Sequence, residues 1–141
     1  MTRRSLLASP LLAFNAPAQP GRIARAPGTH LQLALNAYSF NAPLRAGALT
    51  LFDVVDFCAR HQIAALDATG YYFPGYPATP PARYLADLKR HAFVQGVTIH
   101  GTGVRNDFAT ADAAQRAADL TLVKRWTDAA AQLGAAVIRV F

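Results

Sequence analysis

The chain has 141 residues, of which 52% are hydrophobic and 16% are charged. This balance excludes an intrinsically disordered chain and predicts one globular domain with a sizeable core. The single Cys58 excludes an internal disulfide framework, and its apolar helical setting predicts a small core residue.

The net charge of +6 suggests a nucleic-acid partner, but the distribution of the charge argues against one. Arg3, Arg4, Arg22 and Arg25 all precede the first expected strand. Subtracting these four charges from +6 leaves +2 for the remainder, where Lys and Arg are spread over several expected helices. That is too little charge for a phosphate-binding stripe, so we expect no nucleic-acid partner.

Residues 1–18 have the form of an export signal. A basic start with Arg3 and Arg4 precedes a short apolar run and an Ala-Pro-Ala sequence that fits a cleavage site, and the paired arginines resemble a twin-arginine signal. This predicts a periplasmic or secreted protein; the alternative is a disordered tail on a cytoplasmic one. The apolar run is too short to cross a bilayer, so we expect no stable membrane span. Residues 19–30, rich in Pro, Gly and Arg, predict a linker.

After the linker, the sequence alternates between strand and helix patterns. Thr50, with Asp53 three residues later, predicts a capped helix start. A second start is expected at residues 79–80, with proline at the first helical position, and Gly96 and Gly134 are placed to end helices. We expect strands at 31–40, 63–69, 97–102 and 136–141, with helices beginning at residues 50, 79 and 112 between them.

Each of the three expected helices carries one apolar face at helical spacing. Such a face packs against a sheet, so these residues are the predicted helical part of the core. They are Leu51, Val54, Val55 and Cys58 in the first helix; Tyr84, Leu85, Leu88 and Phe93 in the second; and Ala114, Ala117, Ala118, Leu122, Trp126, Ala130 and Leu133 in the third.

Strand starts recur roughly every 30 to 40 residues, which is the period of βαβ units and predicts parallel strands. The last expected strand, 136–141, has no helix after it. We therefore expect the N-terminal half of a (β/α)8 TIM barrel, with about four parallel strands and three intervening helices, in a truncated chain. A doubly wound sheet fits the same period, but residues 39–43 read Ser-Phe-Asn-Ala-Pro where its glycine-rich turn would stand.

Polar residues gather at the carboxyl ends of the expected strands, where parallel α/β folds bind ligands. Asp67 lies in an apolar strand and fits a metal ligand, an acid or base, an orienting group, or a structural hydrogen-bonded aspartate. His100 fits a proton shuttle, a metal ligand or a satisfied core histidine. Arg105 and Arg139 fit an anionic group, or instead a pair with Asp67 or Asp107.

The loop after the second expected strand carries Tyr71, Tyr72, Phe73 and Tyr76. Aromatic rings with hydroxyl groups suit sugar rings, although the same residues fit plain loop packing over a barrel mouth. No metal-ligand spacing, P-loop or serine-nucleophile motif occurs in the sequence. We therefore assign no catalytic residue from sequence.

Three segments resemble the xylose isomerase-like TIM barrels, the sugar phosphate isomerase/epimerase family. Residues 101–108, Gly-Thr-Gly-Val-Arg-Asn-Asp-Phe, resemble the segment after the third strand, and residues 36–40, Asn-Ala-Tyr-Ser-Phe, resemble the end of the first. Lys-Arg-Trp at 124–126, with Gly134 and Val-Ile-Arg-Val-Phe at 137–141, resembles the third helix and fourth strand. The resemblance covers the whole chain after the linker.

The resemblance implies movement of a proton or hydride between adjacent sugar carbons, assisted by a divalent Mn, Mg or Zn ion. The family's metal-binding carboxylates and histidine lie mainly on strands five to eight, which implies a metal in the complete barrel and none in this half. This half would line the pocket of a sugar or sugar derivative. The substrate-binding candidates are Asn36, Asp67, Tyr72, Thr102, Asn106 and Asp107.

Whether this chain alone is an enzyme is left open; the complete barrel would be an isomerase. One alternative is a non-catalytic carbohydrate-binding half-barrel that forms a homodimer, because half-barrels expose strand edges and apolar faces. Another is an abasic-site endonuclease of the same superfamily, against which the weak charge and the export signal argue. A phosphorylated substrate is not indicated, because no glycine-rich phosphate loop is present.

Overall fold

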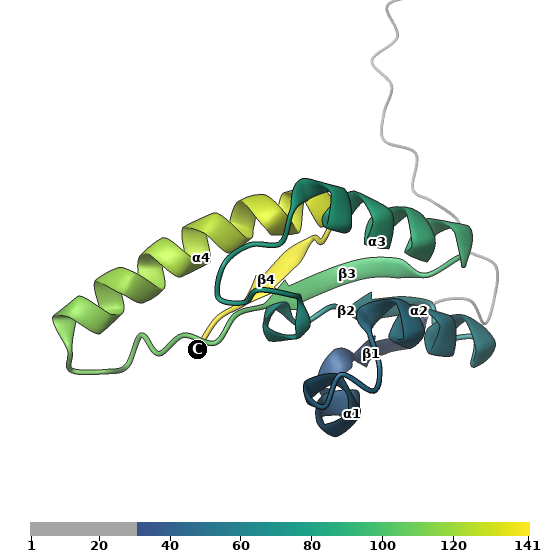
Figure 1. Cartoon of the computed structure of the whole chain (residues 1–141), viewed down its shortest axis with the longest axis horizontal. Helices are drawn as coiled ribbons and strands as arrows, with labels where there is room; N and C mark the ends of the chain where they lie inside the picture. The colour runs from purple at the N-terminus through teal and green to yellow at the C-terminus, as the bar shows by residue number, and fades with distance from the viewer. Residues whose placement is uncertain (1–30) are drawn as a thin grey trace, which may run out of the picture. The chain divides into compact units, whose positions relative to one another are not determined.

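The computed structural model of the chain describes residues 31–141, so the predicted export signal and linker, residues 1–18 and 19–30, lie outside the described residues. Four strands form one parallel sheet in the order β1-β2-β3-β4 (Figure 1). Each strand lies beside the next one in chain order, whereas a doubly wound sheet reverses its order. The strands are β1 (Ala34–Asn36), β2 (Ala65–Asp67), β3 (Thr98–Gly103) and β4 (Val137–Arg139).

Three longer helices connect the strands, as predicted: α2 (Leu51–Arg60), α3 (Ala82–Val94) and α4 (Ala113–Leu133). They pack side by side, α2 on α3 and α3 on α4, and cover one face of the sheet (Figure 1). Among the described residues, no helix is long and apolar enough to cross a membrane. The structure adds three short elements that the sequence did not predict, namely η1 (Ala37–Phe40), α1 (Asn41–Arg45) and η2 (Gly70–Tyr72).

The first strand is shorter than predicted because its last residue begins a helical turn. The side-chain oxygen of Asn36 accepts a hydrogen bond of 2.9 Å from the N–H of Tyr38 and caps η1. This local bond offers the backbone an alternative to the strand ladder. The predicted strand 31–40 is therefore a three-residue strand followed by η1 and α1.

The start of α2 is the predicted capping box. The hydroxyl of Thr50 accepts a hydrogen bond of 3.3 Å from the N–H of Asp53, and the Thr50 N–H donates to the Asp53 carboxylate at 2.7 Å. These bonds from Thr50 hold the pKa of Asp53 below its ordinary value. The predicted apolar face is confirmed, because its members Leu51, Val54, Val55 and Cys58 are all buried.

Helix α3 begins two residues later than predicted, with Pro81 as its N-cap. Pro80 precedes another proline, and a residue in that position is pushed out of the helical region into extended backbone. The predicted end before Gly96 is confirmed. The expected burial of Phe93 is wrong, because this side chain is 83% exposed while Leu85 and Leu88 of the same helix are buried.

Helix α4 begins and ends as predicted. Asp112 accepts hydrogen bonds from two N–H groups of the first turn, and Gly134 ends the helix with a left-handed φ of 79°. Its 21 residues span about 31 Å, whereas the six residues of β3 span about 20 Å. The first half of α4 therefore extends past the sheet (Figure 1), and the predicted burial there is wrong. The exposed residues are Ala114, Ala117 and Ala118.

Alternate strand residues divide the sheet into a helix-covered face and an opposite face, here named the inner face. Leu66 and Ile99 are paired across β2 and β3 and are buried against the helices. The neighbouring pairs lie on the inner face: Asn36 with Asp67, Asp67 with Gly101, Gly101 with Val137, and Gly103 with Arg139. The inner face thus carries polar groups at the carboxyl ends of its strands.

Candidate functional site

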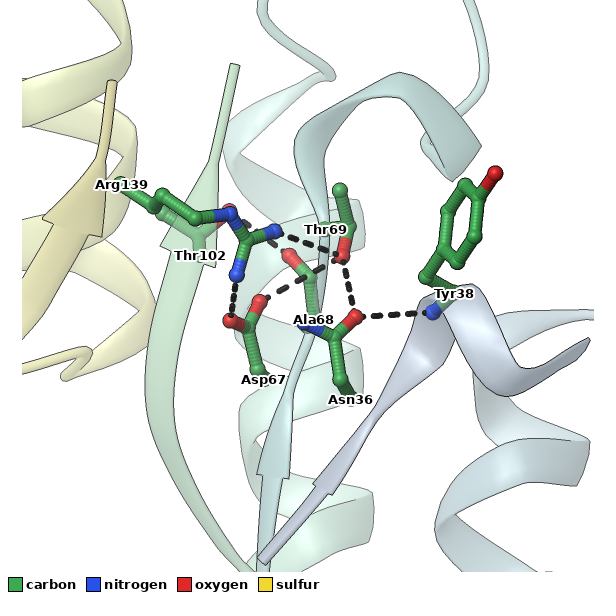
Figure 2. A network of polar contacts seen from close by, with 7 residues as sticks. All are labelled: Asn36, Tyr38, Asp67, Ala68, Thr69, Thr102 and Arg139. Carbon is green, nitrogen blue, oxygen red and sulfur yellow. Dashed lines mark hydrogen bonds and ion pairs between the residues drawn. The ribbon is translucent and has the colours of Figure 1, made fainter. Parts of the chain in front are cut away.

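A connected polar network occupies the inner face at the carboxyl end of the sheet (Figure 2). The guanidinium of Arg139 donates to the carboxylate of Asp67, with Nη1 and Oδ2 2.5 Å apart. The Thr69 hydroxyl lies 3.2 Å from Oδ1 of Asn36 and 3.4 Å from Oδ1 of Asp67, and Nη2 of Arg139 lies 3.5 Å from this hydroxyl. Residues from β1, β2 and β4 therefore meet in one group, which we name the inner-face network: Asn36, Asp67, Thr69 and Arg139.

The network crosses β3 because Gly103 leaves room for it. A Cβ atom on Gly103 would lie 2.9 Å from Nη2 of Arg139, which is closer than real Cβ atoms come, and 3.2 Å from its Cζ, which is a tight contact. The arginine side chain of β4 thus passes over the bare backbone of β3 to reach Asp67 on β2. A glycine inside a strand often marks such a close approach.

The inner-face network carries a balanced charge. Asp67 is only 11% exposed and its charge is matched by Arg139, which is 34% exposed. The pair removes the cost of burying a lone carboxylate. Asp67 is one of the two carboxylate partners that the sequence suggested for Arg139, and the pair provides the Asp67 carboxylate with a hydrogen-bonded cation.

Two of the six predicted site residues, Asn36 and Asp67, belong to this network, while Tyr72 lies apart from it. The Tyr72 hydroxyl donates to Oδ1 of Asn41 at 2.9 Å and links η2 to α1. Burial, followed by the neighbouring Tyr71, raises the pKa of Tyr72 to about 12. Its phenol therefore stays neutral across the physiological range and serves as a hydrogen-bond donor.

Thr102 is fully buried within the sheet. Its hydroxyl donates to the backbone oxygen of Ala68 at 2.7 Å (Figure 2). The bond joins β3 to the residue that follows β2, so the Thr102 side chain is engaged by the protein's own backbone.

Asn106 and Asp107, the remaining two predicted site residues, bind backbone groups in the loop after β3. The Asn106 side chain pairs with the backbone of Phe141 in both directions, donating at 2.5 Å and accepting at 3.0 Å. The Asp107 carboxylate accepts the N–H of Ala109 at 2.9 Å, and the Asp107 N–H donates to Asp119 at 2.9 Å. Both residues shape the loop beside β4, and neither has a hydrogen bond to the inner-face network among the described residues.

His100 is displaced from the pairing register by a bulge. Leu66 pairs with Ile99 and the next residue, Asp67, pairs with Gly101, so His100 is the extra residue in β3. Within residues 31–141, no group of three or more His, Cys, Asp or Glu side chains is placed to hold a metal ion. Asp67 already has a cation partner, so the described donor set does not fit a divalent metal.

Sequence reasoning missed several residues that shape this edge of the sheet. Gly103 could have been found from the Gly-Thr-Gly run at the end of an expected strand, because two glycines on one face signal a close approach. Asp119 carries little signal, because its helix also contains exposed charged residues such as Arg116 and Lys124. Asn41 carries no such signal, since its role depends on where Tyr72 lies.

Comparisons with known proteins bear on the fold. No protein-family model matches the chain, and no curated protein matches it. Among solved structures, the crystal structure of the probable 3-DHS dehydratase AsbF, involved in petrobactin synthesis in Bacillus anthracis, is similar, with a TM-score of 0.56 and 18% identity. The match covers 79% of this chain and 38% of that chain, so this chain spans well under half the length of its neighbour. The predicted fold class is confirmed: residues 31–141 form an α/β unit of four parallel strands that matches part of a TIM barrel.

Proposed function

We propose that residues 31–141 form one wall of the ligand pocket of a xylose isomerase-like (β/α)8 barrel, and that the ligand is a small sugar or sugar derivative. The inner-face network is the observation that carries this proposal. It lies on the face opposite the helices, which is the interior in a complete barrel, at the carboxyl ends of the strands, where ligands bind in such folds. The solved structure similar to this chain is described as a probable dehydratase, an enzyme, which is consistent with a catalytic barrel.

The charge balance of the network supports a neutral ligand rich in hydroxyl groups. Arg139 offers N–H donors, while Asn36 and Asp67 offer oxygen acceptors, and the fully buried Thr69 holds these two in place. A sugar presents donors and acceptors side by side and matches such a mixed array. A phosphate group requires an excess of positive charge, and here the guanidinium is neutralised by Asp67.

In this proposal, the catalytic groups come from the part of the barrel beyond these four strands. A divalent Mn, Mg or Zn ion would polarise a carbonyl or hydroxyl group when bound there. The described residues bind and orient the substrate: Arg139 fixes one hydroxyl by donation and Asn36 fixes the next, while the buried Thr69 keeps Asn36 in position. Residues 1–18 are proposed to direct the protein out of the cytoplasm by a twin-arginine route.

A sugar titration of the isotope-labelled 141-residue chain tests the proposal by NMR. With xylose as the probe, we expect saturable shifts of backbone amides around the inner-face network. Arg139→Gln should weaken this binding about fivefold, since one hydrogen bond to a neutral group is lost. Arg60→Gln, an equal charge change at the exposed end of α2, should leave it unchanged. Shifts located elsewhere, or an equal loss in both variants, would contradict the proposal.

The sheet edges favour a second candidate function, a carbohydrate-binding half-barrel that closes with a second copy of itself. Among the described strands, β1 and β4 each have a neighbour on one side only. Apolar residues at β4 and after it are exposed, with Val137 57% and Phe141 61% exposed. Free edges and apolar patches favour association.

Analytical ultracentrifugation distinguishes this second candidate. A half-barrel that closes with a second copy predicts a dimer of the unchanged chain. Val137→Lys should give a monomer, because it places a charge on the inner face that the two copies share. Leu120→Lys, on the exposed side of α4, is the matched control and should stay dimeric. A monomer for the unchanged chain would remove the candidate.

A further inference from the structure

A separate cavity of about 560 Å³ lies between the loop that follows η2 and the first half of α4. Both of its walls belong to the described residues. One wall contains Tyr76 and Pro77, the other contains Leu122 and Arg125 of α4, and Arg105 closes the rim. The Trp126 side chain fixes the first wall to the helix, because its Nε1 donates to the backbone oxygen of Pro77 at 3.1 Å. The volume is within the range of small-molecule sites.

Arg105 is held in place without a carboxylate partner. The Tyr76 hydroxyl accepts the Arg105 N–H at 2.8 Å and donates to the Arg105 backbone oxygen at 3.3 Å, so this backbone is clamped in both directions. The guanidinium lies 5.2 Å from the centre of the Tyr71 ring, which holds it by a cation–π contact. Its N–H groups stay exposed to solvent and available to a ligand.

Positive charge exceeds negative charge around this cavity. Arg105 and Arg125 both line it, and among residues 31–141 neither has a carboxylate oxygen within 4.0 Å. The one lining carboxylate, Asp119, is 5% exposed, and its two oxygens accept hydrogen bonds from the Asp107 N–H and the Gln115 amide, each at 2.9 Å. The two exposed guanidinium groups therefore dominate the rim.

We infer that this cavity binds a small oxyanion attached to an apolar body, such as an aromatic carboxylate. The anionic group lies between Arg105 and Arg125, whose guanidinium forks match carboxylate geometry. The apolar body contacts Pro77 and Leu122. This site is distinct from the inner-face network, and the inference does not depend on the function proposed for that network.

The fluorescence of Trp126, the single tryptophan of the chain, provides a direct reading of this site. Its indole packs against Tyr76 with ring centres 5.7 Å apart and bonds to Pro77, so a ligand against this wall changes its surroundings. Titration of the 141-residue chain with benzoate should give a saturable change in emission. Benzamide, which has the same shape and no charge, should bind at least about tenfold more weakly, because charge-assisted hydrogen bonds are lost.

Two arginine substitutions locate the bound anion. Arg105→Gln and Arg125→Gln should each weaken benzoate binding about tenfold, while Arg105→Lys should retain part of it because the charge remains. Arg83→Gln on α3 removes an equal charge outside the cavity and should bind like the unchanged chain. Circular dichroism confirms that each variant is folded. Absence of saturable benzoate binding, equal binding of benzamide, or an equal loss in Arg83→Gln would overturn the inference.

Discussion

Two arginines stand at the carboxyl end of the same sheet, each beside an aromatic ring, and differ in whether a carboxylate partners them. Arg139 reaches across β3 to the carboxylate of Asp67, and its charge is neutralised within the protein. Arg105 rests on the ring of Tyr71, a contact that orients the guanidinium and leaves its charge unmatched. The partner of each cation, more than its position, underlies the ligands that we propose: hydroxyl groups for the inner-face network and an oxyanion for the cavity beside α4.

The largest expected effect comes from a substitution at Gly70, which lies against Gly103 near the inner-face network and against Trp126 near the cavity. A Cβ atom there would lie 2.7 Å from the backbone oxygen of Gly103 and 3.1 Å from the Trp126 ring. Because a backbone oxygen has little freedom to move, Gly70→Ala should lower the free energy of unfolding by about 2 to 3 kcal/mol and weaken both sites. Urea unfolding measures the loss.

The control for this change is Gly47→Asn. Gly47 has a left-handed φ of 69°, which asparagine tolerates, and no atom stands within 4 Å of its added Cβ. A loss at Gly47 as large as that at Gly70 would show that the close contact at Gly70 is not the cause.

Asp67→Asn should leave Arg139 without a carboxylate partner, in the same situation as Arg105. The substitution keeps the shape of the side chain and removes its charge, so Arg139 becomes an unmatched cation. We expect a loss of roughly 1 to 2 kcal/mol in stability, since the pair is only partly buried, and a gain of phosphate binding at the inner face. Calorimetry with inorganic phosphate and urea unfolding measure the two effects.

Asp87→Asn is the matched control for the loss of a carboxylate. Asp87 pairs with Arg83 at 3.7 Å on the exposed side of α3, where such pairs contribute little. Phosphate binding that appears equally in both variants would contradict the role given to Asp67.

Tyr76→Phe tests how strongly the cavity's rim is held. The substitution keeps the ring and removes the hydroxyl that bonds to the Arg105 backbone in both directions, which should cost about 1 kcal/mol. Amide hydrogen exchange at Arg105 should become faster. Tyr38→Phe, where the ring is 57% exposed, should leave this exchange unchanged, and equal exchange in the two variants would show that the clamp contributes nothing.

The last expected effect is confined to alkaline pH and concerns Tyr72 of η2. Burial raises the pKa of Tyr72 to about 12 in the folded protein from an ordinary value near 10. Its contribution to stability is therefore complete below pH 10 and is lost as the pH rises toward 12, because the unfolded chain ionises first. Tyr72→Phe should lose less stability over this interval than the unchanged chain. Parallel losses, measured by urea unfolding at several pH values, would contradict the shift.

The sequence was most informative where contacts are local. The cap at Thr50, the start at Asp112 and the end at Gly134 depend on residues within one helical turn, and all three were predicted correctly. The same local logic failed at Pro80, where the effect of the next proline was overlooked. It also failed at Asn36, whose side chain ends β1 early.

The candidate site was less predictable because its contacts join distant parts of the chain. Asp67 and Arg139 are separated by 72 residues, and sequence alone offered their pairing as one alternative among several. The cavity beside α4 depends on how the loop that follows η2 meets the loop after β3, a geometry set by Tyr76 and Trp126 together. The spacing of residues along the chain does not predict a contact between two such loops.

The bare backbone of β3 at Gly103 has a consequence for the order of folding. The bond from Arg139 to Asp67 passes over this strand, so it forms only after β2, β3 and β4 have taken their places. A contact between residues so far apart in the chain has a larger entropic cost of loop closure than a local contact. The inner-face network therefore requires β2, β3 and β4 to be paired, and its appearance in time-resolved measurements reports that these strands are in register.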